Sequence, residues 1–131
     1  MSQENVEVVR RHMEAYLAGN YEGALDAYAP DVEIDVSVRP GGRVYRGRGG
    51  VIEAFRVWRG TFKDWEGAVE EVVGARDRVL LVLRESGRGR GSGVKVEQQT
   101  FFVYTLRGGM IAHATVLMDE EEARQAAGLR E

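Results

Sequence analysis

The second half of the chain contains four consecutive segments rich in β-branched and aromatic residues, with only short connectors between them. The segments are residues 69–73, 79–83, 94–106 and 110–118, and residues 74–78, 87–93 and 107–109 join them. Such residues favour strands. Connectors this short join antiparallel neighbours, because a parallel crossover needs roughly a dozen residues or more. The second half is therefore predicted to be an antiparallel meander.

Two helices and a strand are predicted before the meander. Apolar residues recur every three or four positions over residues 2–18, the pattern of an amphipathic helix that Gly19 ends. Asn20 is placed to cap a second, short helix, which stops before Pro30 because proline disfavours helical geometry in the residue that precedes it. Residues 32–38 then alternate strictly between apolar and polar, which predicts a strand with one buried face.

A third helix is predicted over residues 51–62, with an aromatic inner stripe. The stripe consists of Val51, Phe55, Trp58 and Phe62. A closing helix over residues 119–127 begins with a capping box, in which Asp119 accepts from the first-turn amides and Glu122 reaches back to the N-cap amide. The predicted order ααβαββββα indicates an α+β fold. At 131 residues the chain is expected to form a single domain, residues 1–131.

Composition excludes several kinds of chemistry. The chain has no cysteine, which excludes disulfides, a thiolate nucleophile and thiolate-ligated metals, and two histidines leave little for a metal site. We therefore expect no cofactor. A net charge of −3 argues against general nucleic-acid binding. The first thirty residues are charged where a signal peptide needs an apolar segment, and no run of apolar residues could span a membrane, so we expect a cytoplasmic location.

Arginines cluster in two glycine-rich loops. They are Arg39, Arg43, Arg46 and Arg48 in one loop, and Arg88 and Arg90 in the other. An anionic ligand or an RNA phosphate could bind there. Neither loop has the sequence or the strand–loop–helix context of a phosphate-binding motif. We favour solvated loops at turns.

Four segments carry a resemblance to a known family. They are VVRRHMEAYLAGNYEGALDAYAPDVEI (8–34), VYRGRGGVIEAF (44–55), GRGRGSGVKVE (87–97) and TLRGGMIAHATVLMDEEEARQAAGL (105–129). In this order they resemble the nuclear-transport-factor-2-like superfamily, and within it the SnoaL-like polyketide cyclases and ketosteroid isomerases. The resemblance implies a cone: a curved antiparallel sheet wraps the N-terminal helices and leaves an apolar pocket at its open end. It also implies a homodimer, formed through the outer face of the sheet.

At the positions that match the catalytic residues of ketosteroid isomerases, this chain has residues of other types. Ketosteroid isomerases use a carboxylate base and an oxyanion hole made by a tyrosine and a protonated acid. Aligned on the AG turn, the tyrosine position holds His12 and the base position holds Val36; the second acid falls near Phe101 or Phe102. The isomerase route is therefore disfavoured. The Asp–Arg–Asp relay of epoxide hydrolases on this fold has no counterpart either, since Arg84 and Glu85 are adjacent and face opposite sides.

His12 is the candidate catalytic residue. It lies beside the buried stripe of the first helix, and a histidine in a pocket could act as acid, base or hydrogen-bond donor. A histidine at the edge of the core is the alternative. His113 is expected on the outer face, because the family comparison turns Ala114 and Val116 inward. The candidate ligand-binding residues are Tyr16, Tyr28, Val36, Phe55, Trp58, Phe62, Phe101, Ala114 and Val116.

Three functions stay open from the sequence. The first is a pocket protein that binds a small apolar or aromatic metabolite. The second is an isomerase, cyclase, lyase or hydrolase acting on a small apolar or polyketide-like substrate, with His12 as acid or base. The third is a protein-interaction module.

Overall fold

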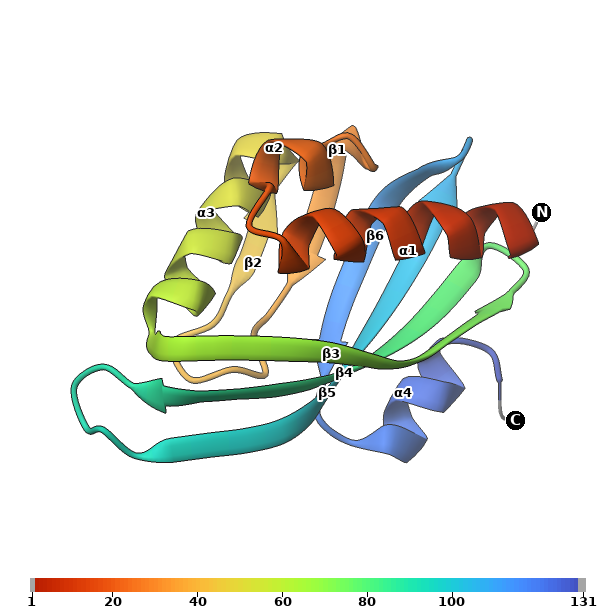
Figure 1. Ribbon diagram of the computed structural model, residues 1–131. Helices are drawn as coiled ribbons and strands as arrows, with labels where there is room; N and C mark the ends of the chain where they lie inside the picture. The colour runs from red at the N-terminus through yellow and green to blue at the C-terminus, as the bar shows by residue number, and fades with distance from the viewer. Residues whose placement is uncertain (1, 130–131) are drawn as a thin grey trace.

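A computed structural model describes residues 2–129, which form one six-stranded, curved sheet with helices on both faces (Figure 1). The elements are α1 Ser2–Leu17, α2 Tyr21–Leu25, β1 Tyr28–Asp35, β2 Val44–Arg46, α3 Gly47–Gly60, β3 Phe62–Ala75, β4 Arg78–Gly89, β5 Lys95–Arg107, β6 Met110–Leu117 and α4 Glu120–Ala126. The α+β class and the order ααβαββββα are confirmed, with the three-residue β2 as an addition. Within the described residues, no helix has the length and apolar character needed to cross a membrane.

The sheet has the strand order β2-β1-β6-β5-β4-β3. Strands β3 to β6 form the predicted antiparallel meander, joined by short turns. Strand β1 is the exception to an antiparallel sheet, because it pairs in parallel with β6 through Ile34 and Ala114. This pairing connects the N-terminal half of the chain to the end of the meander and extends the curved sheet by β1 and β2.

The boundaries of the first half differ from the predictions for backbone reasons. Helix α2 ends at Leu25, and Tyr28 already pairs with Ile111 of β6, whose amide donates to the Ala27 carbonyl over 2.7 Å. Strand β1 ends at Asp35, since the following residues turn, with the Arg39 amide donating to the Val36 carbonyl over 3.0 Å. Long-range pairing and a local turn therefore override the alternation of residues 32–38.

Helix α3 and strand β3 also differ from the predictions. Helix α3 ends at Gly60, so Phe62 is the first residue of β3 and not part of the helix. Strand β3 is longer than predicted, because its polar first half pairs with β4 without alternating apolar residues to mark it. The N-cap residue of α4 is Asp119 as predicted, but its side chain makes no capping hydrogen bond. At α2 the cap is confirmed: the Asn20 carboxamide oxygen accepts from the Gly23 amide over 2.9 Å.

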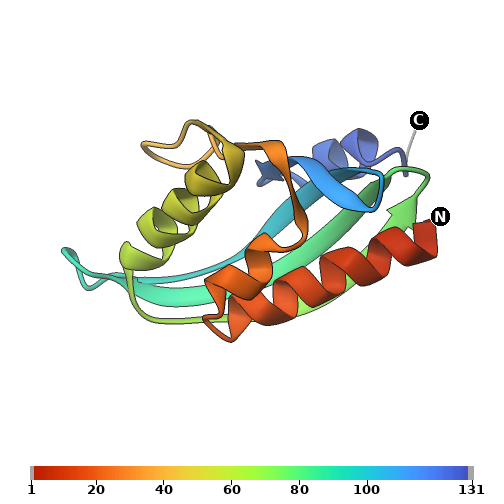
Figure 2. The same ribbon diagram turned by 90° about the horizontal axis from the view of Figure 1, so that it is seen from above.

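The central parts of β4 and β5 are buried on both faces. Helices α1, α2 and α3 cover the concave face, whereas α4 lies on the opposite side of the long strands (Figures 1 and 2). On β4, Val79, Leu81 and Leu83 belong to the concave core. The residues between them, Leu80 and Val82, pack under α4. Two separate cores therefore share one set of strands.

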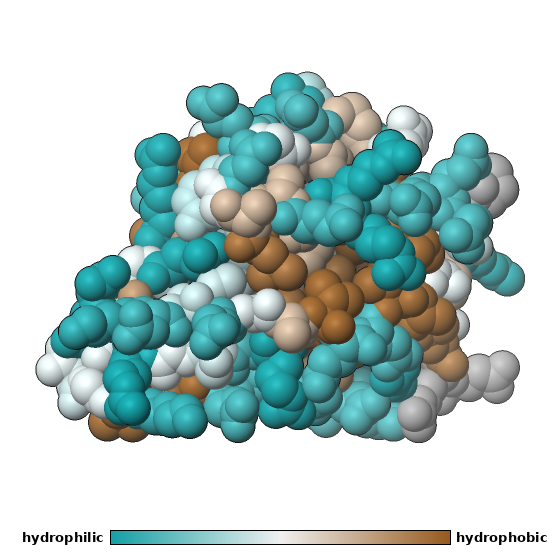
Figure 3. All heavy atoms as spheres, viewed as in Figure 1, coloured by the Kyte–Doolittle hydropathy of each residue, from teal (hydrophilic) through white to brown (hydrophobic). Residues whose placement is uncertain are grey.

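The edge strand β3 leaves apolar side chains accessible. Figure 3 shows apolar residues gathered between α1 and β3 on this face of the molecule. Val69 of β3 is 39% exposed, and Val72 is half-buried against the concave core. The free edge of β3 is thus partly apolar, although charged residues surround it.

The β5–β6 hairpin offers a test of the turn chemistry. Gly108 and Gly109 have φ angles of +60° and +80°, a conformation that costs other L-residues roughly 1–2 kcal/mol each. Gly109→Ala is therefore expected to lower the free energy of unfolding by about 1 kcal/mol, measured by urea denaturation. Gly91→Ala, in an open loop position without a positive φ, is the control and should change little. Equal stability of both variants would contradict the assignment.

Candidate functional site

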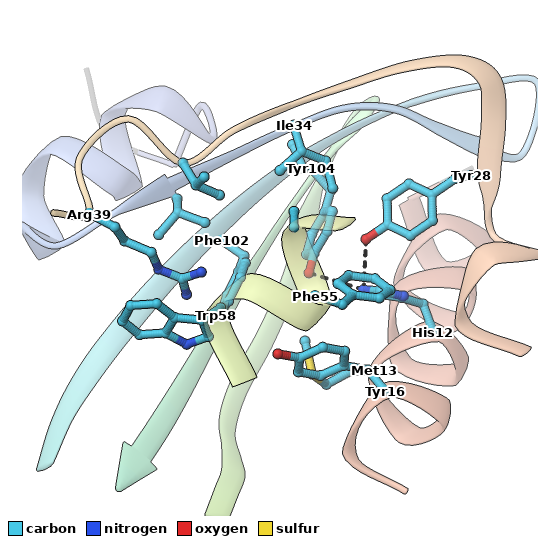
Figure 4. Close-up of a pocket in the computed structure, with 14 residues that line it drawn as sticks. His12, Met13, Tyr16, Tyr28, Ile34, Arg39, Phe55, Trp58, Phe102 and Tyr104 are labelled. Atoms are coloured by element: carbon cyan, nitrogen blue, oxygen red, sulfur yellow. Dashed lines mark hydrogen bonds between the residues drawn. The ribbon is translucent and has the colours of Figure 1, made fainter. Parts of the chain in front are cut away.

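A narrow cavity of about 40 Å³ lies between α1, α3 and the concave face of the sheet (Figure 4). Its lining is mostly aromatic and aliphatic: His12, Met13, Tyr16, Tyr28, Ile34, Val36, Arg39, Ala54, Phe55, Trp58, Phe102, Tyr104, Ala114 and Val116. A space of this size holds a few water molecules. A larger ligand can enter only if lining side chains move.

The mouth of the cavity can be identified from burial. Arg39, Trp58 and Phe102 are half-buried, whereas every other lining residue is buried. Figure 4 shows these three residues together at one end, and His12 and Tyr28 at the other. The cavity thus has a closed end at α1 and a mouth beside the loop that follows β1.

Most of the predicted site residues meet at this cavity. His12 lines it, as do all of the candidate ligand-binding residues except Phe62 and Phe101. Phe62 lies just beyond the mouth, where its ring packs edge-on against Trp58 with 4.8 Å between centroids. Placing Phe101 in the pocket was wrong: it packs under α4 with Leu80 and Val82, and Phe102 faces the cavity instead. Adjacent strand residues point to opposite faces, so one position decides the side.

His12 is the centre of the closed end. Its side chain is on α1 and the residue is 3% exposed. The Tyr28 hydroxyl lies 3.0 Å from His12 Nε2, and the Tyr104 hydroxyl lies 3.4 Å from the same nitrogen. A neutral imidazole nitrogen without hydrogen has a single lone pair. When Tyr28 donates to it, the Tyr104 hydroxyl hydrogen is left for another acceptor in the cavity.

The groups at the closed end are uncharged at neutral pH. Burial lowers the pKa of His12 to about 4, although the nearby Ala24 backbone opposes this shift. The other ring nitrogen of His12, Nδ1, is buried and has no hydrogen-bond partner among the described residues. Burial also raises the pKa of Tyr16, Tyr28 and Tyr104. The imidazole is therefore neutral and the phenols keep their protons, so this end offers hydrogen bonds and no charge.

Arg39 was missed as a site residue, because the arginine loop was expected to be solvated. Its side chain is only 10% exposed, and its guanidinium carbon lies 3.8 Å from the centre of the Trp58 ring. The turn from Val36 to Arg39 folds this side chain over α3. Arg43 and Arg46 behave as expected and form exposed ion pairs with Glu53 and Glu33, whereas Arg48 donates two hydrogen bonds to the Tyr28 carbonyl over 2.9 and 2.7 Å.

Glu85 is the second residue that the sequence did not reveal. It lies on β4, is 3% exposed, and its carboxylate accepts three hydrogen bonds and forms one ion pair. Oε1 accepts from the indole nitrogens of Trp58 (2.8 Å) and Trp65 (3.0 Å), and Oε2 accepts from the Thr100 hydroxyl. Arg39 Nη2 lies 3.7 Å from Oε2. The sequence feature that could have identified Glu85 is a single acid that follows the apolar run of residues 79–83 on the same strand.

The remaining candidates have structural surroundings. His113 lies on β6 next to Ala114, outside the lining of the cavity, with its Nδ1 3.5 Å from the Thr115 hydroxyl. Arg84 is directed away from Glu85 and pairs with Glu70 over 3.0 Å. Across residues 2–129, no group of three or more acidic or histidine side chains is arranged to hold a metal ion.

Comparison with known proteins gives the family and the fold. The family model of the SnoaL-like domain matches residues 9–114. No functionally curated protein matches the sequence. Among solved structures, a protein from Jannaschia assigned as a SnoaL-like polyketide cyclase superposes with a TM-score of 0.78 at 20% identity, over 99% of this chain and 95% of that one.

Two further structures were solved with small molecules. TerC, co-crystallised with polyporic acid, has a TM-score of 0.76 at 18% identity, covering 95% of this chain and 98% of its own. A Catenulispora acidiphila protein with a ketosteroid isomerase-like fold, in complex with trimethylamine, has a TM-score of 0.73 at 16% identity, covering 95% and 94%. At these identities the likeness establishes the fold, and activity must be argued from the site.

The buried His12 should make stability depend on pH. Its pKa is about 4 in the folded chain against 6.5 unfolded, so the unfolded state binds more protons between these values. The free energy of unfolding should therefore fall as the pH is lowered from 7, by about 2 kcal/mol at pH 5. Urea denaturation of His12→Gln should lack this loss, while His113→Gln should retain it. An unchanged pH dependence in His12→Gln would rule out the buried neutral histidine.

Proposed function

The chain belongs to the SnoaL-like domain family, and from that premise we propose that it binds a small, largely apolar or aromatic molecule in the cavity between α1, α3 and the sheet. The observation that carries this proposal is the composition of the lining. Aromatic and aliphatic side chains form most of the walls, and the polar lining residues are His12, Arg39 and the three tyrosines Tyr16, Tyr28 and Tyr104. Apolar walls with a few fixed polar groups are typical of small-molecule sites.

The polar groups suit a ligand that is apolar along its length. At the closed end, Tyr28 and Tyr104 converge on His12 and can share their hydrogen bonds with a ligand oxygen. Along the walls, Phe55 and Tyr16 pack with ring centroids 4.8 Å apart and offer aromatic edges and faces. The ligand would enter between Arg39, Trp58 and Phe102, and opening this mouth would enlarge the present space of about 40 Å³.

The related structures support small-molecule binding on this fold. TerC was crystallised with polyporic acid and the Catenulispora protein with trimethylamine. The protein-interaction alternative predicts a filled core, and the cavity favours ligand binding over it. The homodimer and the cytoplasmic location expected from the sequence stay predictions.

An enzyme is the second candidate function, favoured by the position of His12 at the closed end of the cavity. An acid or base works best when its pKa lies near the working pH. With a pKa of about 4, His12 is a weak base, which favours binding over proton transfer. An isomerase-, cyclase-, lyase- or hydrolase-type activity would predict that His12→Gln abolishes turnover of a small ketone or polyketide-like substrate while the variant stays folded.

Filling the cavity should abolish ligand binding. Ala114 lines the cavity and faces Tyr104 across β5 and β6, so the side chain of Ala114→Met would occupy the closed end. With 2-naphthol as a neutral probe, the wild type should gain several degrees in Tm at about 100 times Kd, which corresponds to about 2.7 kcal/mol. Ala114→Met should bind the probe at least tenfold more weakly, and its gain in Tm at the same probe concentration should be smaller.

Ala68→Met is the matched control, because Ala68 is exposed on β3 and should bind like the wild type. Ala54→Leu fills the cavity from α3 and replaces Ala114→Met if the latter is destabilised by overpacking. Native mass spectrometry of gently purified protein should show the same order of occupancy. Undiminished probe binding to both cavity variants would contradict the proposed site.

A further inference from the structure

Arg39 has hydrogen-bonding capacity that the protein itself does not use. A guanidinium carries five N–H donors. Among the described residues the side chain of Arg39 makes no hydrogen bond, and its Nε is buried without a partner. The nearest acceptor is Glu85 Oε2, and its distance of 3.7 Å from Nη2 is an ion-pair distance too long for a hydrogen bond. A side chain that is nine-tenths buried therefore lines the cavity with a guanidinium whose Nε has no partner and whose Nη2 has only a 3.7 Å ion pair.

Glu85 cannot satisfy this cation, because its carboxylate is already held by other groups. Trp58 and Trp65 donate to one oxygen and Thr100 donates to the other. These three donors come from α3, β3 and β5, so the carboxylate is fixed from several sides. Its negative charge lies 3.7 Å from Arg39 Nη2 and forms an ion pair with it, without a hydrogen bond between the two side chains. A small shift that brought Glu85 closer to Arg39 would break bonds to the indoles.

Trp58 fixes the orientation of the guanidinium. The guanidinium carbon lies over the Trp58 ring at 3.8 Å, and the same indole donates its N–H to Glu85. The ring of Phe102 is also near the guanidinium, with 5.9 Å between its centre and the guanidinium carbon of Arg39. With its carbon over this ring, the planar guanidinium has N–H donors whose arrangement suits the two oxygens of a carboxylate. Figure 4 shows Arg39 at the mouth of the cavity, beside Trp58 and Phe102.

We propose that Arg39 binds a carboxylate of the ligand at the mouth of the cavity, so that the ligand class is an aromatic or apolar carboxylic acid. This inference rests on the proposed function. The acid group binds the guanidinium edge, and the apolar body extends along Trp58 and Phe55 towards His12. Neutral groups at the closed end accept the body without a second charge. Arg39 is then the specificity-determining residue of the site.

A pair of probes that differ only in charge tests the proposal. 2-Naphthoate and 2-naphthamide share one ring system, and isothermal titration calorimetry at pH 7.5 measures both affinities. The wild type should bind the acid at least tenfold more tightly than the amide, since hydrogen bonds to a charged group are the stronger ones. Arg39→Met should remove this preference, so that the acid and the amide bind with equal affinity. Arg43→Met, in the same loop but exposed, should keep the preference.

A second variant separates anion binding from a structural role of Arg39. Glu85→Gln removes the anion that competes for Arg39, and it should increase the preference for the acid further. If Arg39→Met alone is poorly folded because Glu85 is left without its cation, Arg39→Met combined with Glu85→Gln removes both charges, and it too should bind acid and amide equally.

The outcomes distinguish this inference from the proposed function. Amide binding reports the cavity itself, and the acid-to-amide ratio reports Arg39. Equal affinities in the wild type, or a preference that survives Arg39→Met, would overturn the carboxylate inference and leave the pocket intact. If neither probe binds the wild type at millimolar concentration, the proposed function is contradicted and the inference fails with it.

Discussion

Burial of strands β4 and β5 on both faces is the constraint on which the rest of the structure depends. Residues 79–83 are almost fully buried, because helices cover the concave side and α4 covers the other. Strands β4 and β5 therefore contribute to two cores at once, and the alternation of side chains decides which core receives each residue. On β5, Tyr104 and Phe102 reach the cavity whereas Phe101 and Val103 pack under α4. The walls of the site are set by this partition.

The concave core leaves a cavity, and the polar groups around it are satisfied to different degrees. His12 Nε2 is matched by Tyr28 while His12 Nδ1 has no partner among the described residues, and Glu85 is matched by two indoles and a hydroxyl. Buried polar groups are normally hydrogen-bonded, because an unpaired one loses its water without compensation. Arg39 departs from this rule at the mouth. The contrast between a satisfied carboxylate and an unsatisfied cation identifies where a ligand group would be stabilised.

The site keeps the architecture of its family and differs in its ionisable groups. The position that resembles the isomerase base holds Val36, which is a buried, apolar part of the lining. The position that resembles the oxyanion tyrosine holds His12, a neutral group with a low pKa. The charges near the cavity belong instead to Arg39 and Glu85, at the mouth. Such an arrangement is suited to recognising a charged end of a ligand and holding an apolar body.

The sequence by itself determined the class of fold, the antiparallel meander and the glycine turns, because these follow from local periodicity and turn chemistry. The aromatic cavity with His12 beside it was expected from the resemblance to a family. The structure alone decided that Phe102 and not Phe101 faces the cavity, since a run buried on both faces shows no alternation of apolar and polar residues. It also decided that Arg39 is buried and that Glu85 meets Trp58, Trp65 and Thr100. Those contacts join a loop, a helix and three strands, and only long-range pairing brings them together.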